Sequence, residues 1–87
     1  MQILIGTIKE ISAIDSNKTG FRKQIVKLES TDNQSAFIEF RGEIMNHLEP
    51  FTIGQKAVVA IQMKTSVSKK SGIQFNNLIA KSIKPAA

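Results

Sequence analysis

The 87-residue sequence contains no cysteine and only one histidine, His47. Disulfide bonds and thiolate metal sites are therefore excluded, and one histidine cannot form a zinc site by itself. Tryptophan and tyrosine are also missing, so the five phenylalanines are the only aromatic side chains. Because neither disulfides nor a metal hold the chain together, its stability must come from the packing of a hydrophobic core.

Long hydrophobic runs are absent as well. No apolar segment approaches the roughly 20 residues that a membrane-spanning helix needs, and the first residues lack the basic region and cleavage site of a signal peptide. A chain of 87 residues, 41% of them hydrophobic, has room for one core. We therefore expect a cytoplasmic protein with no membrane partner, with a single domain over residues 1–84 and a frayed tail at 85–87.

Acidic residues are missing from the last part of the chain. Between Lys56 and Ala87 there are six lysines and no aspartate or glutamate, whereas the segment before it, 31–55, is net acidic. Such a concentration of basic charge is typical of a protein that binds a polyanion, because each neutralised phosphate releases condensed counterions.

Hydrophobic residues recur mostly with a period of two, which is typical of β-strands. A long first strand, bent near Gly6, should run to about Ile14, and turn-forming residues follow it. Residues 43–48 have the apolar spacing of a short amphipathic helix, which Pro50 ends. The pattern predicts four further strands, at 21–28, 36–42, 56–64 and 73–83, and polar loops at 15–20, 30–35 and 66–72.

Three strands, one short helix and two more strands is the order of the oligonucleotide/oligosaccharide-binding (OB) fold, a small five-stranded barrel. We therefore predict an all-β OB-fold barrel with its one helix between the third and fourth strands. An SH3-like barrel also has five short strands, but it does not require the helix at 43–48. A ferredoxin-like fold needs two helices of substantial length, and the pattern contains no second one.

Four short motifs resemble the DUF3127 family of small bacterial proteins, and together they span nearly the whole chain. They are Phe21-Arg22-Lys23-Gln24, Phe37-Ile38-Glu39-Phe40-Arg41-Gly42, Leu48-x-x-Phe51-x-x-Gly54 and Phe75-Asn76-Asn77-Leu78-x-Ala80. The resemblance implies an OB barrel similar to single-stranded-DNA-binding proteins, with a role on single-stranded nucleic acid.

The chain departs from this family at its aromatic positions. Members carry an aromatic residue near positions 21, 41, 74 and 81, and this chain retains only the first. The residues at these four positions are Phe21, Arg41, Gln74 and Lys81. Stacking contributes ~1–3 kcal/mol per base, so we expect weakened binding, partly offset because a guanidinium group also stacks on bases.

In an OB barrel, the outer face of the second and third strands forms a groove for an extended strand of nucleic acid. The loops at 15–20 and 66–72 should bound this groove, and its cations should contact phosphates while phenylalanines stack on bases. The predicted binding residues are Lys18, Phe21, Arg22, Lys23, Lys27, Phe37, Arg41, Lys69 and Lys70. No side chain is placed to read base edges, so we predict binding with little sequence preference. The expected partner is single-stranded nucleic acid, with DNA favoured over RNA.

A second hypothesis belongs to a different class. The barrel could be an assembly module whose apolar exterior pairs with another protein or with its own copy, as a homodimer or homotetramer. Ile3, Val58 and Ala60 would then lie at the contact. Under this hypothesis Phe21 or Phe37 could cover an interface or belong to the core, and the lysines would serve solubility.

Catalytic motifs are missing. The sequence has no phosphate-binding loop, dinucleotide fingerprint, nucleophile motif or convincing carboxylate pair. His47 lies near Glu43 and Glu49, but such neighbours are ordinary on a helix. We therefore predict a protein that is not an enzyme, with no cofactor, metal or small-molecule substrate.

Overall fold

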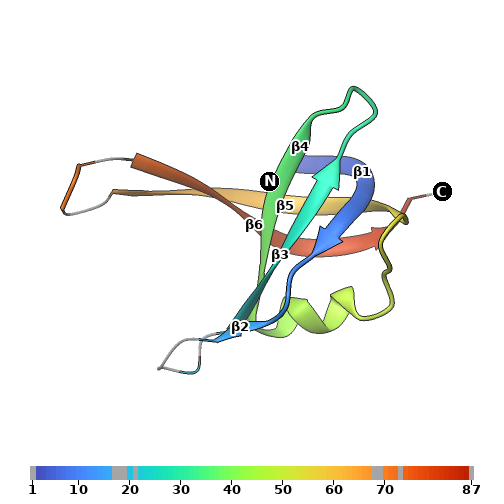
Figure 1. The fold of residues 1–87 in the computed structure, drawn as a ribbon, viewed down its shortest axis with the longest axis horizontal. Coiled ribbons are helices and arrows are strands. Elements are labelled where there is room, and N and C mark those ends of the chain that lie inside the picture. The colour runs from blue at the N-terminus through green and yellow to red at the C-terminus, as the bar shows by residue number, and fades with distance from the viewer. Residues whose placement is uncertain (1, 17–19, 21, 68–69, 73, 87) are drawn as a thin grey trace.

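The computed structural model describes residues 2–16, 20, 22–67, 70–72 and 74–86. These residues form strands and one short 3-10 helix, η1, which lies in the chain between β4 and β5 (Figure 1). The elements are β1 (Gln2–Ile11), β2 (Asp15–Ser16), β3 (Arg22–Glu29), β4 (Ser35–Arg41), η1 (Gly42–Leu48), β5 (Lys56–Val67) and β6 (Gln74–Pro85). No helix in this part of the chain is long and apolar enough to cross a membrane.

The five long strands form a sheet that closes on itself. β1 pairs antiparallel with both β5 and β3, and β3 pairs antiparallel with β4. β4 then pairs with β6 in parallel, and β6 pairs with β5 to complete the ring. The short helix lies against one end of this closed sheet (Figure 1). The predicted order of strands and helix is therefore present.

The core is made by alternate residues of the strands, as the period of two predicts. Val26, Ile38 and Val59 are fully buried, and residues of η1 and the segment after it close one end of the core. The core residues are Ile8, Val26, Leu28, Ile38, Phe40, Met45, Leu48, Phe51, Ala57, Val59, Ile61 and Ala80.

Gly6 lies where β1 changes partner, which is where the sequence predicts a bend. Residues 2–7 of β1 pair with β5, and residues 7–11 pair with β3. Thr7, the residue after Gly6, pairs with both strands. A Cβ atom on Gly6 would lie 2.5 Å from the carbonyl oxygen of Glu29 and 3.1 Å from Cγ of Leu28. Only glycine allows the two backbones to approach this closely. An irregularity in the pairing between Ile8 and Glu10 adds further curvature.

The hairpin of β5 and β6 is longer than the sequence pattern suggests. Residues 66–67, predicted to start a loop, still belong to β5, and the hairpin extends past the closed sheet as an arm (Figure 1). The alternation of apolar residues along 56–64 predicts that Met63 faces the core together with Val59 and Ile61, but 53% of Met63 is exposed. The prediction for Met63 was wrong because the core ends before the strand does.

Two further differences concern segments predicted to be irregular. Asp15 and Ser16, placed in a loop by their composition, form the short strand β2 against β3. At the other end of the chain, Pro85 pairs with Ala57, and the N–H of Ala86 donates to the carbonyl oxygen of Lys56 at 3.1 Å. Residues 85–86 of the expected frayed tail are thus held by pairing with β5, and Ala87 lies outside the described residues.

We predict that Gly6→Ala lowers the free energy of unfolding by about 2 kcal/mol, because the added methyl group forces β1 and β3 apart. Chemical denaturation of the variant and the wild type measures this difference. Ser35→Ala, at an exposed position of β4, is the control and should change stability by less than about 0.5 kcal/mol. Equal stability of Gly6→Ala and wild type would show that the close approach is not a constraint.

Candidate nucleic-acid interface

One side of β3 and β4 faces outward and carries six residues, which we call the outer face. In the register of the two strands, Lys23 pairs with Arg41, Ile25 with Glu39, and Lys27 with Phe37. Residues that pair directly in an antiparallel sheet lie on the same face. The residues between them, such as Val26 and Ile38, point into the core.

Phe37 is the exposed aromatic residue of this surface. Its exposed fraction is 58%, and Nζ of Lys27 lies 6.0 Å from the centroid of its ring. Phe37 also lines a groove of about 480 Å³ that crosses from β4 over β3 to β1. The groove residues are Glu10, Ile11, Ser12, Ile25, Lys27, Phe37 and Ile53. An exposed ring beside a cation and an open apolar groove can stack on a flat ligand.

Ile53, at the far end of this groove, comes from the turn before β5. Two hydrogen bonds hold that turn against β1. The N–H of Gly54 donates to the carbonyl oxygen of Ile8 at 2.7 Å. The N–H of Ile8 in turn donates to the carbonyl oxygen of Gln55 at 2.9 Å. Ile53 was not among the predicted binding residues, because only these long-range contacts bring the turn beside the strand.

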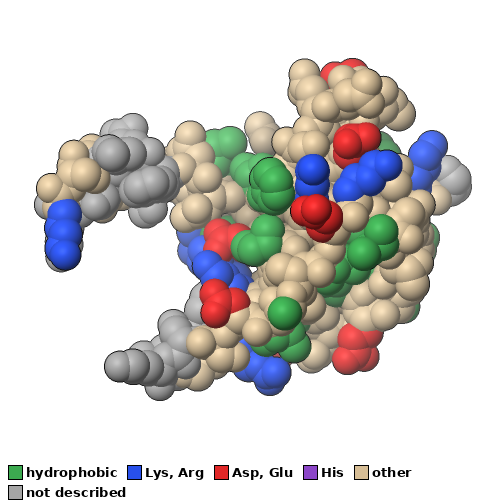
Figure 2. All heavy atoms as spheres, viewed as in Figure 1, with side chains coloured by type: hydrophobic (Ala, Val, Ile, Leu, Met, Phe, Trp, Pro, Cys, Tyr) green, Lys and Arg blue, Asp and Glu red, His purple; other side chains and the backbone are tan. Residues whose placement is uncertain are grey.

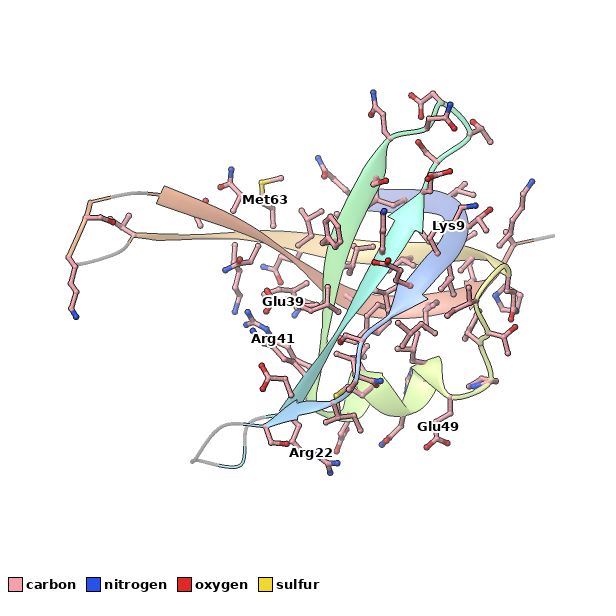
Figure 3. All side chains as sticks on the ribbon, viewed as in Figure 1. Lys9, Arg22, Glu39, Arg41, Glu49 and Met63 are labelled. Carbon is pink, nitrogen blue, oxygen red and sulfur yellow. The ribbon has the colours of Figure 1, made fainter. Side chains whose placement is uncertain are left out.

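Glu39 lies in the middle of the outer face and is nearly buried, with 12% of its side chain exposed. Nζ of Lys23 donates to its Oε1 at 3.3 Å, and Nη2 of Arg41 donates to its Oε2 at 3.1 Å. Figure 3 shows the side chains of Glu39 and Arg41 close together beside β4. Glu39 therefore binds two of the three cations of the outer face.

Two more carboxylates lie beside the same cations. Glu10 of β1 pairs in register with Lys27, and Asp15 of β2 pairs with Lys23. Three cations of the outer face thus have three acidic neighbours across adjacent strands. In Figure 2, acidic and basic side chains lie side by side over this region, with hydrophobic side chains between them. This surface is balanced in charge and is not basic by itself.

The excess of positive charge lies on the hairpin of β5 and β6. Lys64 of β5 is exposed and lies on the same side as Gln62. Gln62 pairs with Ile79, which in turn pairs with Glu39, so Lys64 extends the outer face onto the hairpin. Lys70, near the hairpin turn, is also exposed. Lys64 was not among the predicted binding residues, although the period of two along 56–64 would have indicated its side.

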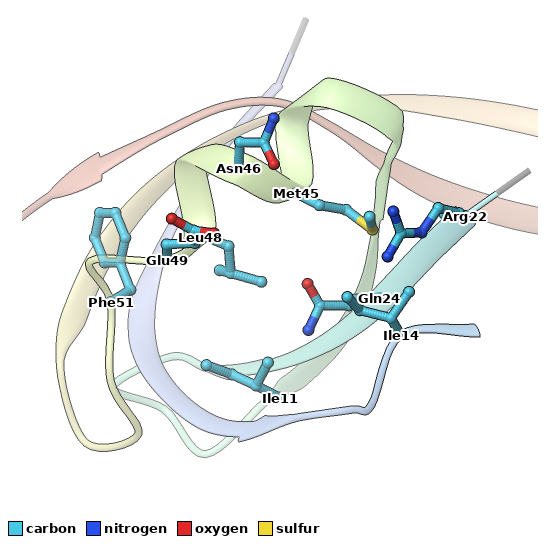
Figure 4. A pocket seen from close by; sticks show the side chains of 9 residues that line it. All are labelled: Ile11, Ile14, Arg22, Gln24, Met45, Asn46, Leu48, Glu49 and Phe51. Carbon is cyan, nitrogen blue, oxygen red and sulfur yellow. The ribbon is translucent and has the colours of Figure 1, made fainter. Parts of the chain in front are cut away.

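The structure brings together four of the predicted binding residues on the outer face: Lys23, Lys27, Phe37 and Arg41. Arg22 is separate from them, because it lies on the other side of β3. There it lines a second cavity of about 480 Å³ with Met45 and Asn46 of η1 (Figure 4). Lys70 is exposed on the hairpin. Three predicted residues, Lys18, Phe21 and Lys69, lie outside the described residues.

The titratable groups of the described residues provide no metal-binding cluster. Among the described residues, no three histidine, aspartate or glutamate side chains are grouped so that they could hold a metal ion. In the turn between β3 and β4, the hydroxyl of Ser30 donates to Asp32 and lowers the pKa of that carboxyl. Ionised Asp32 therefore stabilises the folded state. This contribution to the free energy of unfolding is lost as the pH falls below the ordinary pKa of aspartate and Asp32 is protonated.

Solved structures share this arrangement of strands. A deletion mutant of the single-stranded DNA binding protein from Thermus aquaticus superposes with a TM-score of 0.73 at 16% identity, over 98% of this chain. The N-terminal domain of PriB from Thermoanaerobacter tencongensis, in a dimeric structure, has a TM-score of 0.59 at 11% identity, over 99% of this chain. The chain has the OB fold. At these identities the likeness establishes the fold alone.

The chain spans 49% of the Thermus protein and 94% of the PriB domain. No family model matches the sequence, and no curated protein matches it either. The resemblance to the DUF3127 family therefore stays a prediction from short motifs, whereas the predicted OB fold is confirmed.

We predict that Phe37→Ala changes the free energy of unfolding by less than about 0.5 kcal/mol, because the ring is mostly exposed. Phe40, the next phenylalanine of β4, is 0% exposed, and Phe40→Ala should cost about 3–5 kcal/mol. Thermal or chemical denaturation of the two variants tests this contrast. A large loss of stability in Phe37→Ala would mean that its ring serves packing.

Proposed function

We propose that this chain binds single-stranded nucleic acid across the outer face, with little preference for sequence. DNA is the proposed ligand in preference to RNA. The observation that carries the proposal is the exposed ring of Phe37, which lies beside Lys27 and an apolar groove. Stacking of one base on such a ring contributes ~1–3 kcal/mol and tolerates any base. The fold shared with the Thermus single-stranded DNA binding protein supports the same class of ligand.

In the proposed complex, bases contact the groove between Phe37 and Ile53. Phosphates contact Lys27 on the outer face and Lys64 and Lys70 on the hairpin, which is where the described chain has unbalanced positive charge. The other predicted binding residues, Lys18, Phe21 and Lys69, lie outside the described residues and remain part of the proposal as predicted from the sequence. The balanced charge of the outer face implies few neutralised phosphates, and therefore a moderate dependence of affinity on salt.

Fluorescence anisotropy with a labelled oligo-dT of about 30 nucleotides tests the proposal, because one OB fold covers ~4–16 nucleotides. We expect single strands to bind better than duplex of the same length and binding to weaken with salt. Phe37→Ala should weaken binding by roughly 5- to 150-fold, which corresponds to one lost stacking contact. An RNA oligomer in the same titration compares the two nucleic acids.

Ile5→Ala is the matched control for Phe37→Ala, because Ile5 is equally exposed but lies on β1, outside the groove. This variant should bind like the wild type. Equal affinities of Phe37→Ala and wild type, or the absence of single-strand binding at low salt, would contradict the proposed function.

A second candidate function, self-association, is favoured by an apolar patch on the outside of β1 and β5. Ile3 is 62% exposed and Ile5 is 59% exposed. Ile3 pairs with Ala60, and Ile5 pairs with Val58, so the four side chains share one face. Exposed apolar patches are typical of protein interfaces. The PriB domain of similar fold was solved as a dimer. Because the patch shares no residue with the groove, self-association and nucleic-acid binding are compatible.

We predict that the wild type forms a dimer whose population rises with concentration and that Ile5→Asp remains monomeric, because a charge in the patch would lose its hydration on association. Sedimentation velocity over a range of concentrations measures this. Ile53→Asp, which introduces the same charge at an exposed isoleucine away from the patch, should leave the dimer intact. A wild type that is monomeric at every concentration would rule out self-association.

A further inference from the structure

We infer that Glu39 is an internal competitor for nucleic-acid phosphates, a residue that limits the affinity and the salt dependence of the outer face. Its carboxylate binds Lys23 and Arg41 in the free protein, so that a phosphate competes with it for either cation. This inference rests on the proposed function. It adds that a single acidic residue determines which cations of the site are available.

The geometry of the ion pairs supports this role. Both oxygens of Glu39 are engaged, one by Nζ of Lys23 at 3.3 Å and the other by Nη2 of Arg41 at 3.1 Å. The side chains of Lys23 and Arg41 are 34% and 30% exposed, so both are within reach of a ligand. The carboxylate itself is only 12% exposed. A phosphate that drew both cations away would leave a nearly buried carboxylate without them, which is unfavourable.

The surroundings of Glu39 strengthen this competition. In the register of the sheet, Glu39 lies between Ile25 of β3 and Ile79 of β6, and Ile79 is buried. Apolar neighbours on both sides keep water away from the carboxylate. Attraction between opposite charges is stronger, and less screened by salt, where water is excluded. Glu39 therefore holds its two cations more firmly than a carboxylate on an open surface would.

Lys27 and Glu10 provide an internal comparison on the same surface. They pair in register, yet within the described part of the chain no ion pair joins Lys27 to a carboxylate. Lys27 instead lies over the ring of Phe37. Glu10 is exposed. The charge of Glu10 repels a phosphate from a distance, but no ion pair joins Glu10 to a cation of the described residues. A comparison of Glu10 with Glu39 therefore distinguishes a general effect of charge from direct competition for a cation.

Glu39→Gln tests the inference, because glutamine keeps the size of the side chain and one acceptor oxygen while it removes the charge. Because the competing charge beside Lys23 and Arg41 is removed, we expect oligo-dT affinity to rise about tenfold. The plot of log affinity against log salt should become steeper by ~0.7 for each additional phosphate contacted. A change in folding alone would not steepen this plot. Thermal unfolding of the variant establishes that it is folded.

Glu10→Gln is the matched control, since it changes the net charge by the same amount on the same face. It should raise affinity less than Glu39→Gln does and leave the salt slope close to that of the wild type. If Glu39→Gln and Glu10→Gln behave alike while the wild type binds single strands, the inference is overturned and the proposed function stands. If none of the three proteins binds at low salt, both are overturned.

A second pair of variants keeps the inference testable if Glu39→Gln does not fold. In the wild-type background, Lys27→Gln should lower the salt slope by ~0.7, because Lys27 is available to a phosphate. Lys23→Gln should lower the slope much less, because Lys23 is already paired with Glu39. Equal decreases in the two variants would show that Glu39 does not compete.

Discussion

The close approach of β1 and β3 at Gly6 is the constraint on which the rest of the structure depends. Because Gly6 has no Cβ, β1 can pair with β5 along its first half and with β3 along its second, and the sheet can close. Closure then separates two sets of alternating residues. One set forms the core around Ile38 and Phe40, and the other forms the outer face with Phe37 and Glu39.

The outer face combines an exposed ring with balanced charge, and the net positive charge of the chain lies on the hairpin beside it. Binding at such a surface would depend mainly on stacking, with the lysines of the hairpin adding attraction for phosphates. At the centre of the surface, Glu39 forms ion pairs with both Lys23 and Arg41 and so reduces the positive charge there. The apolar patch of β1 and β5 is separate, so one barrel can present two different surfaces.

Much of this could be predicted from the sequence, because a period of two assigns residues to faces without knowledge of their partners. Phe37, Lys27 and Arg41 were placed on one side correctly for that reason. The balance of charge could not be predicted, because it depends on which residues of β1 and β2 pair with β3. Ile53 and the length of the hairpin depend on contacts between distant segments, and local composition carries no signal of them.

The most direct test of the account is an NMR titration of the isotope-labelled protein with oligo-dT, followed through backbone and methyl resonances. If the outer face is the binding site, resonances of Ile25, Lys27, Phe37 and Ile53 should shift together and saturate. Those of Ile3 and Val58, on the apolar patch of β1 and β5, should stay in place. Shifts confined to the β1 and β5 patch, or no shifts at all, would contradict a nucleic-acid site on the outer face.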